Sequence, residues 1–222
     1  MKIRTVLYIV IKKEMLQMKH IVCLGDSITD AQRLFSPDGL GYGYVKILSD
    51  QMPDDVLITN RGVDGFTVLR LLENVERDCI SKMPDLVTIL IGINDVGLIM
   101  GEEGRPERQN AYVERFRMTY RQLVKQIVEG TDAPVILMEP FLFPCPEKYK
   151  NWFPYVKILS KEVKKISRDY QTAFLSLHEP LNSLASEIGM DAVTSDGIHL
   201  TEEGHGFLAR LLRQKMKELQ KH

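Results

Sequence analysis

The stretch "IVCLGDSITD", residues 21–30, decides how the chain is read. An apolar run ends at Gly25, and Asp26 and Ser27 follow at once. A short continuous apolar run is typical of a strand that is covered on both faces of a sheet. Ligands bind beyond the carboxyl ends of such strands. A carboxylate and a hydroxyl at this point therefore predict a functional site at the edge of the sheet.

Four further apolar runs follow, separated by amphipathic stretches. The predicted strands are "HIVCLG" (20–25), "VLITNRG" (56–62), "DLVTILIG" (85–92), "PVILMEP" (134–140) and "AFLSLH" (173–178). The predicted helices cover residues 42–51, 68–80, 110–129, 154–170, 181–188 and 201–220. Strands that alternate with helices predict a doubly wound α/β sheet that is mostly parallel. Because no repeat or Gly/Ser linker interrupts the pattern, we expect one domain over residues 20–222 and an N-terminal extension over residues 1–19.

The composition excludes several classes of protein. The 222 residues include 29 Lys and Arg against 30 Asp and Glu, so the net charge of −1 gives no electrostatic reason to bind nucleic acid. Cys23, Cys79 and Cys145 are odd in number and lack a CxxC spacing, which argues against a disulfide framework or a zinc site. We expect neither a metal nor a cofactor.

The first residues superficially resemble a signal peptide. A basic start precedes an apolar run at Val6–Ile11, but this run is short and charged residues 12–14 follow directly. The run is also too short to span a bilayer. We therefore expect a cytoplasmic protein without a membrane contact. Met15 and Met18 leave open that translation starts further along the chain.

Polar residues and glycines follow the predicted strands. They are Gly25-Asp26-Ser27, Asn60-Arg61-Gly62 and Gly92-Ile93-Asn94-Asp95, and near the end of the chain stands the pair Asp196 and His199. Serine needs an adjacent base to act as a nucleophile, and imidazole titrates close to neutral pH. A carboxylate then orients the imidazole ring. We predict that Ser27 is the nucleophile, His199 the base and Asp196 the orienting carboxylate.

These residues resemble the four sequence blocks of the SGNH hydrolases, also called the GDSL esterase family. The blocks correspond to Gly25-Asp26-Ser27, to Gly62, to Gly92-x-Asn94-Asp95 and to Asp196-x-x-His199, and the resemblance extends from His20 to Gln220. It implies a three-layer α/β/α fold with a flavodoxin-like five-stranded parallel sheet. It also implies an oxyanion hole formed by the N–H groups of Ser27 and Gly62 and the side chain of Asn94.

Three stretches, "GDSITDAQR", "IGINDV" and "MEPFLFP", resemble the branch of this family that contains acetylxylan esterases. That branch removes acetyl groups from sugar hydroxyls, so we expect an acetylated sugar such as a xylo-oligosaccharide as substrate. The aromatic segment 139–154 carries the single tryptophan, Trp152, which we predict to stack on a sugar ring or to shape a small acyl pocket. The alternative is that this segment packs onto the body of the protein or onto another subunit of a homo-oligomer.

Other functions share the same residues. Lysophospholipases and thioesterases use the same four blocks, so hydrolysis of longer acyl esters is the main alternative. An acetyltransferase would use the same serine and histidine with another acceptor than water. A non-catalytic binding module would have lost catalytic residues, and here all are present. We expect Asp26, Asp30 and Asp95 to brace the loops that follow their strands, and His205 to be packed or exposed on the last helix.

Overall fold

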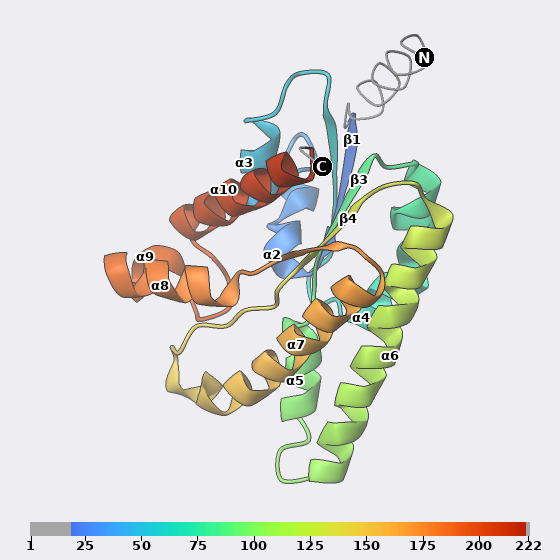
Figure 1. Ribbon diagram of the computed structural model, residues 1–222. Helices are drawn as coiled ribbons and strands as arrows, with labels where there is room; N and C mark the ends of the chain where they lie inside the picture. Colours follow the sequence, from blue (N-terminus) through green and yellow to red (C-terminus); the bar gives the residue numbers. More distant parts are fainter. Residues whose placement is uncertain (1–18, 221–222) are drawn as a thin grey trace, which may run out of the picture.

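A parallel five-stranded sheet forms the centre of the protein. The computed structural model describes residues 19–220 (Figure 1), so the predicted extension lies almost wholly outside the described residues. The strands are β1 (His20–Gly25), β2 (Leu57–Gly62), β3 (Leu86–Leu90), β4 (Val135–Met138) and β5 (Ala173–Leu175). Their order is β2-β1-β3-β4-β5, and every pairing is parallel. This order confirms the predicted flavodoxin-like sheet.

Helices cover both faces of the sheet. They are α2 (Ser27–Asp30), α3 (Tyr44–Ser49), α4 (Val68–Asp78), α5 (Ile93–Met100), α6 (Pro106–Gly130), α7 (Phe153–Asp169), α8 (His178–Ile188), α9 (Met190–Val193) and α10 (Glu202–Leu219), with 3-10 turns η1 (Arg33–Phe35), η2 (Ile80–Lys82) and η3 (Glu147–Trp152). The helices α3 and α10 pack together on one face, and α4, α6 and α7 form the other layer (Figure 1). None of the helices within residues 19–220 is long and apolar enough to cross a membrane.

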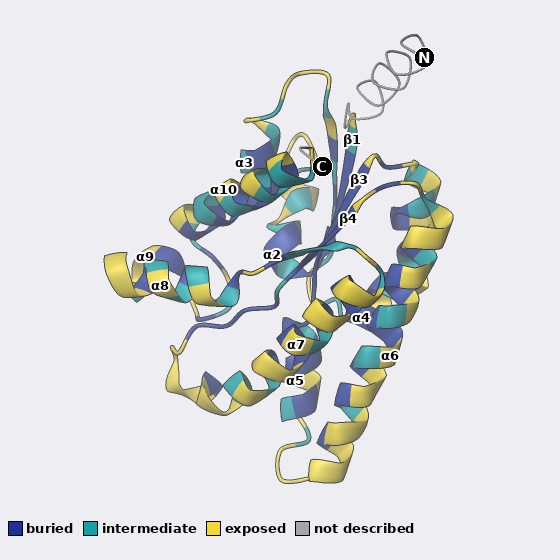
Figure 2. Ribbon diagram, in the orientation of Figure 1, coloured by how far each residue is buried: buried dark blue, intermediate teal, exposed yellow. Residues whose placement is uncertain are grey.

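The central strands are buried on both faces, as their continuous apolar sequences predict. All residues of β3 and β4 are buried, and β1 is buried from Ile21 onward (Figure 2). Cys23 is fully buried within β1 and packs as a small apolar residue. Since each large apolar side chain contributes about 1.5–3 kcal/mol on burial, this core holds the sheet as a rigid mount for its edge.

Three strands end at the same level. Gly25 at the end of β1 pairs with Gly62 of β2 on one side and with Leu90 of β3 on the other. The single turn of α2 folds back directly over this edge. A Cβ atom on Gly62 would lie 2.2 Å from the backbone nitrogen of Asp30, and a Cβ on Gly25 would lie 2.1 Å from Thr29 Oγ1. Only glycine at both positions lets α2 lie this close to the sheet.

We expect Gly62→Ala to destabilise the protein, because the added methyl group meets the backbone of α2 rather than a movable side chain. Overpacking of this kind costs about 1–3 kcal/mol. Gly101→Ala is the matched control, since Gly101 has a helical φ of −60° and its nearest atom would lie at an ordinary 3.4 Å. Urea denaturation measures both variants. Equal stability of Gly62→Ala and the wild type would contradict the close contact.

Candidate active site

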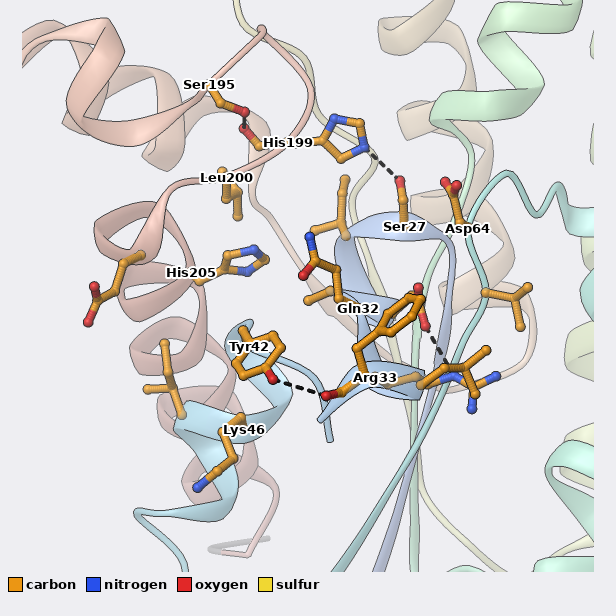
Figure 3. Close-up of a pocket in the computed structure, with 18 residues that line it drawn as sticks. Ser27, Gln32, Arg33, Tyr42, Lys46, Asp64, Ser195, His199, Leu200 and His205 are labelled. Carbon is orange, nitrogen blue, oxygen red and sulfur yellow. Dashed lines mark hydrogen bonds and ion pairs between the residues drawn. The ribbon is translucent and has the colours of Figure 1, made fainter. Parts of the chain in front are cut away.

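The structure brings Ser27, His199 and Asp196 together in one hydrogen-bonded chain, of which Figure 3 shows the bond between Ser27 and His199. Ser27 Oγ lies 3.0 Å from His199 Nε2, and His199 Nδ1 lies 2.7 Å from Asp196 Oδ2. The serine comes from α2 and the other two residues from the turn before α10, where His199 stands 172 positions later in the sequence than Ser27. The predicted arrangement of nucleophile, base and carboxylate is therefore present in the geometry.

The carboxylate of Asp26 holds the short helix that carries the serine. It caps α2 by accepting a hydrogen bond of 3.0 Å from the backbone N–H of Ile28, and its side chain is buried. The expectation that Asp26 braces this loop is confirmed. Ser27 is the first residue of α2, where helix geometry supplies no acceptor for its N–H. That N–H is consequently available to a ligand.

The turn that carries His199 is fixed by the carboxylate beside it. Asp196 Oδ1 accepts hydrogen bonds from the backbone N–H groups of Ile198 (2.9 Å) and His199 (2.8 Å). Burial alone would raise the pKa of Asp196, but the hydrogen bonds from the His199 ring and from the two N–H groups outweigh it. The net pKa is lowered, so Asp196 is ionised at neutral pH and can stabilise a charged imidazole ring.

Gly62 does not have the role predicted from the sequence. Its N–H donates to the side-chain oxygen Oδ1 of Asn60 at 2.8 Å, so it is already engaged and cannot serve an oxyanion. The glycine is needed instead for the close approach of α2. Gly65, three residues further along in the loop after β2, has a φ of +73°, and its N–H has no hydrogen-bond partner among residues 19–220. Spacing alone did not distinguish the two glycines, although a loop glycine beyond the strand is the better candidate for a free N–H.

Asn94 and Asp95 hold the same loop from the other side. Asn94 Nδ2 donates to the carbonyl oxygen of Phe66 at 3.0 Å, and Asp95 Oδ2 accepts from the N–H of Val68 at 3.1 Å. We expected Asp95 to brace the loop after its own strand, but it ties the start of α5 to the start of α4. Because an amide nitrogen carries two hydrogens, Asn94 keeps one donor for a ligand.

Burial raises the pKa of two carboxyl groups near Ser27. The pKa of Asp26 rises to about 7, although the hydrogen bond from Ile28 and the charge of His199 oppose the rise. The pKa of Asp95 also rises to about 7, with burial as the main cause and the charge of Asp26 as a further one. Two buried acids therefore change charge close to neutral pH.

A cavity of about 1120 Å³ opens beside Ser27 and His199, and we call it the Ser27 cavity. Its walls come from α2 and residues 31–35, from the start of α3, from Val63 and Asp64, and from residues between Ser195 and His205. Figure 3 shows Ser27 and His199 on one side of it and Lys46 on the opposite side. This volume slightly exceeds the upper end of the range of about 300–1,000 Å³ that is usual for small-molecule sites.

His205 lies in the wall of the Ser27 cavity as a neutral donor. Its Nδ1 accepts a hydrogen bond of 3.2 Å from the N–H of Tyr44, so the ring proton is on Nε2. Burial and, to a lesser extent, the charge of His199 together lower the pKa of His205 to about 4. From the sequence we expected His205 to be either packed or exposed, and the structure shows that it is packed. No cluster of three or more His, Cys, Asp or Glu side chains in the described part of the chain is arranged to hold a metal ion.

Trp152 does not line the Ser27 cavity. Its ring meets Tyr149 edge-on with centroids 4.8 Å apart, and it lies against Gly97 of α5. Tyr149 in turn contacts Gly197 in the turn between Asp196 and His199. The predicted stacking of Trp152 on a sugar is therefore not supported, and the alternative, in which the aromatic segment packs onto the body, describes the contacts.

Comparison with known proteins agrees with this geometry. Residues 23–207 match the model of the GDSL-like lipase/acylhydrolase family. The chain belongs to this family. It is thus a carboxylic ester hydrolase.

Individual relatives cover nearly the whole chain. An acetylxylan esterase of Geobacillus stearothermophilus is 31% identical over 209 residues, which span 86% of this chain and 91% of that protein. An acetylxylan esterase of Xylanibacter ruminicola is 25% identical over 89% of this chain, but only 43% of that longer protein is matched. The crystal structure of Axe2, an acetylxylan esterase from G. stearothermophilus, superposes with a TM-score of 0.72 at 27% identity and covers 89% of this chain and 94% of that one.

We predict a pH-dependent gain in stability from Asp95→Asn, because the amide keeps an acceptor for Val68 and has no charge. In the wild type, the unfolded chain loses the Asp95 proton near pH 4, whereas the folded protein keeps it up to about pH 7. The contribution of the protonated Asp95 carboxyl group to the free energy of unfolding of the wild type is therefore complete below about pH 4. It is lost as the pH rises towards 7.

Urea denaturation between about pH 4 and pH 8 measures this difference. The advantage of Asp95→Asn over the wild type should grow across the range and then level off. Asp54→Asn, at an exposed position, is the control for a surface change of the same type. A constant difference between Asp95→Asn and the wild type at every pH would contradict the raised pKa.

Proposed function

We propose that the chain is a serine esterase that removes acetyl groups from carbohydrates such as xylo-oligosaccharides. The observation that carries the proposal is the hydrogen-bonded chain of Ser27, His199 and Asp196 beside a large cavity. The two relatives named acetylxylan esterase support the acetyl and carbohydrate specificity. The cytoplasmic location, the single domain over residues 20–222 and the homo-oligomer stay predictions from the sequence.

The reaction proceeds in two steps. Ser27 Oγ attacks the acetyl carbonyl carbon while His199 Nε2 takes the hydroxyl proton. The C–O bond to the sugar then breaks, and the sugar oxygen leaves with the proton from His199. In the second step His199 takes a proton from water, whose oxygen attacks the acetyl-enzyme, and Ser27 recovers the proton as acetate leaves. The ionised Asp196 stabilises the imidazolium in both steps.

The oxyanion that forms in each step needs preorganised donors. We assign this role to the N–H of Ser27, the N–H of Gly65 and the side-chain amide of Asn94. The support is that the first two groups have no acceptor among residues 19–220 and that Asn94 retains one free amide hydrogen. The hydrogen bond from Asn94 to Phe66 keeps the loop of Gly65 beside the nucleophile.

The alternative of a long acyl substrate is disfavoured by the lining of the Ser27 cavity. Apolar side chains such as Leu34, Phe35 and Ile47 form part of its walls, but the walls also include the charged side chains of Asp30, Arg33, Lys46, Asp64 and Glu202. An apolar acyl chain that covers charged groups removes them from water without giving them hydrogen bonds, which costs free energy. Sugar hydroxyls can form those hydrogen bonds. The lysophospholipase and thioesterase hypotheses gain no such support.

Steady-state kinetics tests the proposed function. We expect kcat/KM for p-nitrophenyl esters to fall steeply from acetate to decanoate, and acetate to be released from acetylated xylo-oligosaccharides. Ser27→Ala should abolish both activities because no other nucleophile lies at that position. A rise of kcat/KM towards octanoate would favour the long-chain alternative, and full activity of Ser27→Ala would exclude the mechanism.

Removal of one oxyanion donor should lower turnover more than substrate binding. We expect Asn94→Ala to reduce kcat by about 10²–10³-fold, the usual cost of one such donor, with a small change in KM. Asn74→Ala, on α4 and away from the cavity, is the matched control. Thermal unfolding of both variants separates a loss of donor from a loss of fold. An unchanged kcat of Asn94→Ala would remove Asn94 from the oxyanion hole.

A further inference from the structure

The Ser27 cavity extends far beyond the space that an acetyl group needs. One continuous segment, residues 31–42, supplies much of its wall through Ala31 to Phe35 and Tyr42. The proposed catalytic chain uses none of these side chains. The segment follows α2 directly, so it lies next to the nucleophile in sequence and in space.

The backbone at the start of this segment is strained. Ala31 has a φ of 41° and Gln32 a φ of 62°, so two consecutive residues that are not glycine occupy the left-handed region. Such conformations persist where surrounding contacts enforce them, and they cluster at functional sites. Here the conformation directs the Gln32 amide into the cavity between Ser27 and His205 (Figure 3). That amide has no hydrogen-bond partner among residues 19–220.

Several contacts hold the segment in place. Asn60 Nδ2 donates to the carbonyl oxygens of Thr29 (2.7 Å) and Leu40 (2.8 Å), which lie just before the segment and near its end. The N–H of Tyr42 donates to the carbonyl oxygen of Ala31 at 2.8 Å, which closes the segment into a loop. Arg33 adds an ion pair with Asp30 at 3.2 Å. A loop fixed in this way binds a ligand without first losing its own conformational freedom.

Two aromatic side chains of the loop are exposed at the cavity. Phe35 is 80% exposed and Tyr42 is 59% exposed, although both line the cavity. The Tyr42 hydroxyl donates to the carbonyl oxygen of Phe35 at 3.1 Å, which fixes one residue relative to the other. Apolar ring faces beside free polar groups match a sugar, which presents C–H groups on its ring face and hydroxyls at its edge.

We propose that residues 31–42 bind the sugar part of the substrate, on the leaving side of the ester bond. Gln32 and the Nε2–H of His205 hydrogen-bond hydroxyls of the acetylated sugar unit, and Phe35 stacks on a neighbouring unit. The site thus selects an acetylated oligosaccharide over a monosaccharide. This inference rests on the proposed function and assigns its specificity to the loop.

The experiment compares three substrates in one assay of acetate release: acetylated xylotriose, acetylated xylose and ethyl acetate. The wild type should prefer the trisaccharide. Phe35→Ala should lower the ratio of kcat/KM for acetylated xylotriose to kcat/KM for acetylated xylose by about five- to tenfold. This factor corresponds to the binding free energy of one aromatic contact. Gln32→Ala should lower kcat/KM for both sugars relative to ethyl acetate by about three- to tenfold, as expected for one hydrogen bond.

Met118→Ala is the control, because Met118 is an exposed apolar residue on α6 outside the cavity, and both substrate ratios should stay at the wild-type values. Unchanged ratios in Phe35→Ala and Gln32→Ala would overturn the proposal. Sedimentation velocity of Phe35→Ala tests whether Phe35 binds a second copy of the chain instead of a sugar. If the variant dissociates from an oligomer while its substrate preference stays unchanged, Phe35 contacts another copy and the proposal is overturned. Failure of the wild type to release acetate from either sugar would instead reject the proposed function.

Discussion

The contact between α2 and the ends of β1 and β2 is the constraint on which the active site depends. The turn that carries Ser27 lies against Gly25 and Gly62, at a distance that no larger residue allows. The parallel register brings both glycines to the same level of a sheet whose central strands are buried. Ser27 therefore has a rigid support, and its N–H, at the first position of α2, has no hydrogen-bond partner among residues 19–220.

Asn60 connects this support to the rest of the site. Its side chain accepts from the N–H of Gly62 and donates to the carbonyl oxygens of Thr29 and Leu40. One buried amide thus joins the end of β2, the helix of the nucleophile and the loop of residues 31–42. Because all of these bonds are buried or partly buried, the loss of any one leaves a polar group without a partner, which is costly. The chemistry at Ser27 and the binding surface beside it are in this way held by the same residue.

The base approaches from the other end of the chain, and aromatic packing determines its position. The N–H of Phe143 donates to the carbonyl oxygen of Gly197 at 2.9 Å, and Tyr149 lies against the same glycine. Trp152 completes this cluster by packing on Tyr149. The aromatic segment after β4 therefore acts on the reaction through the turn of Asp196 and His199. A direct contact between Trp152 and the sugar is not needed to account for its presence.

The sequence was sufficient for the sheet, because continuous apolar runs are a local pattern, and it also named Ser27, Asp196 and His199, which the structure brings into hydrogen-bonding distance of one another. The helices α2, α5 and α9 were missed because they are short, with four, eight and four residues, and a helix of this length carries too few turns for a periodic signal. The roles of Gly62 and Trp152 could not be read from the sequence, because they depend on which N–H is already bonded and which face of a ring is already covered. The left-handed conformation of Gln32 is likewise set by contacts that are distant in sequence, such as those of Asn60.

The central claim is that catalysis passes through an ester on Ser27, and trapping that ester tests it most directly. The enzyme is mixed with p-nitrophenyl acetate, quenched in acid within one turnover, digested and analysed by mass spectrometry. The account predicts a single acetyl group on the peptide that contains Ser27, and no such group in Ser27→Ala. In His199→Ala the acetyl group should form slowly and, once formed, persist longer than in the wild type. An acetyl group at another residue, or turnover by Ser27→Ala at the wild-type rate, would contradict it.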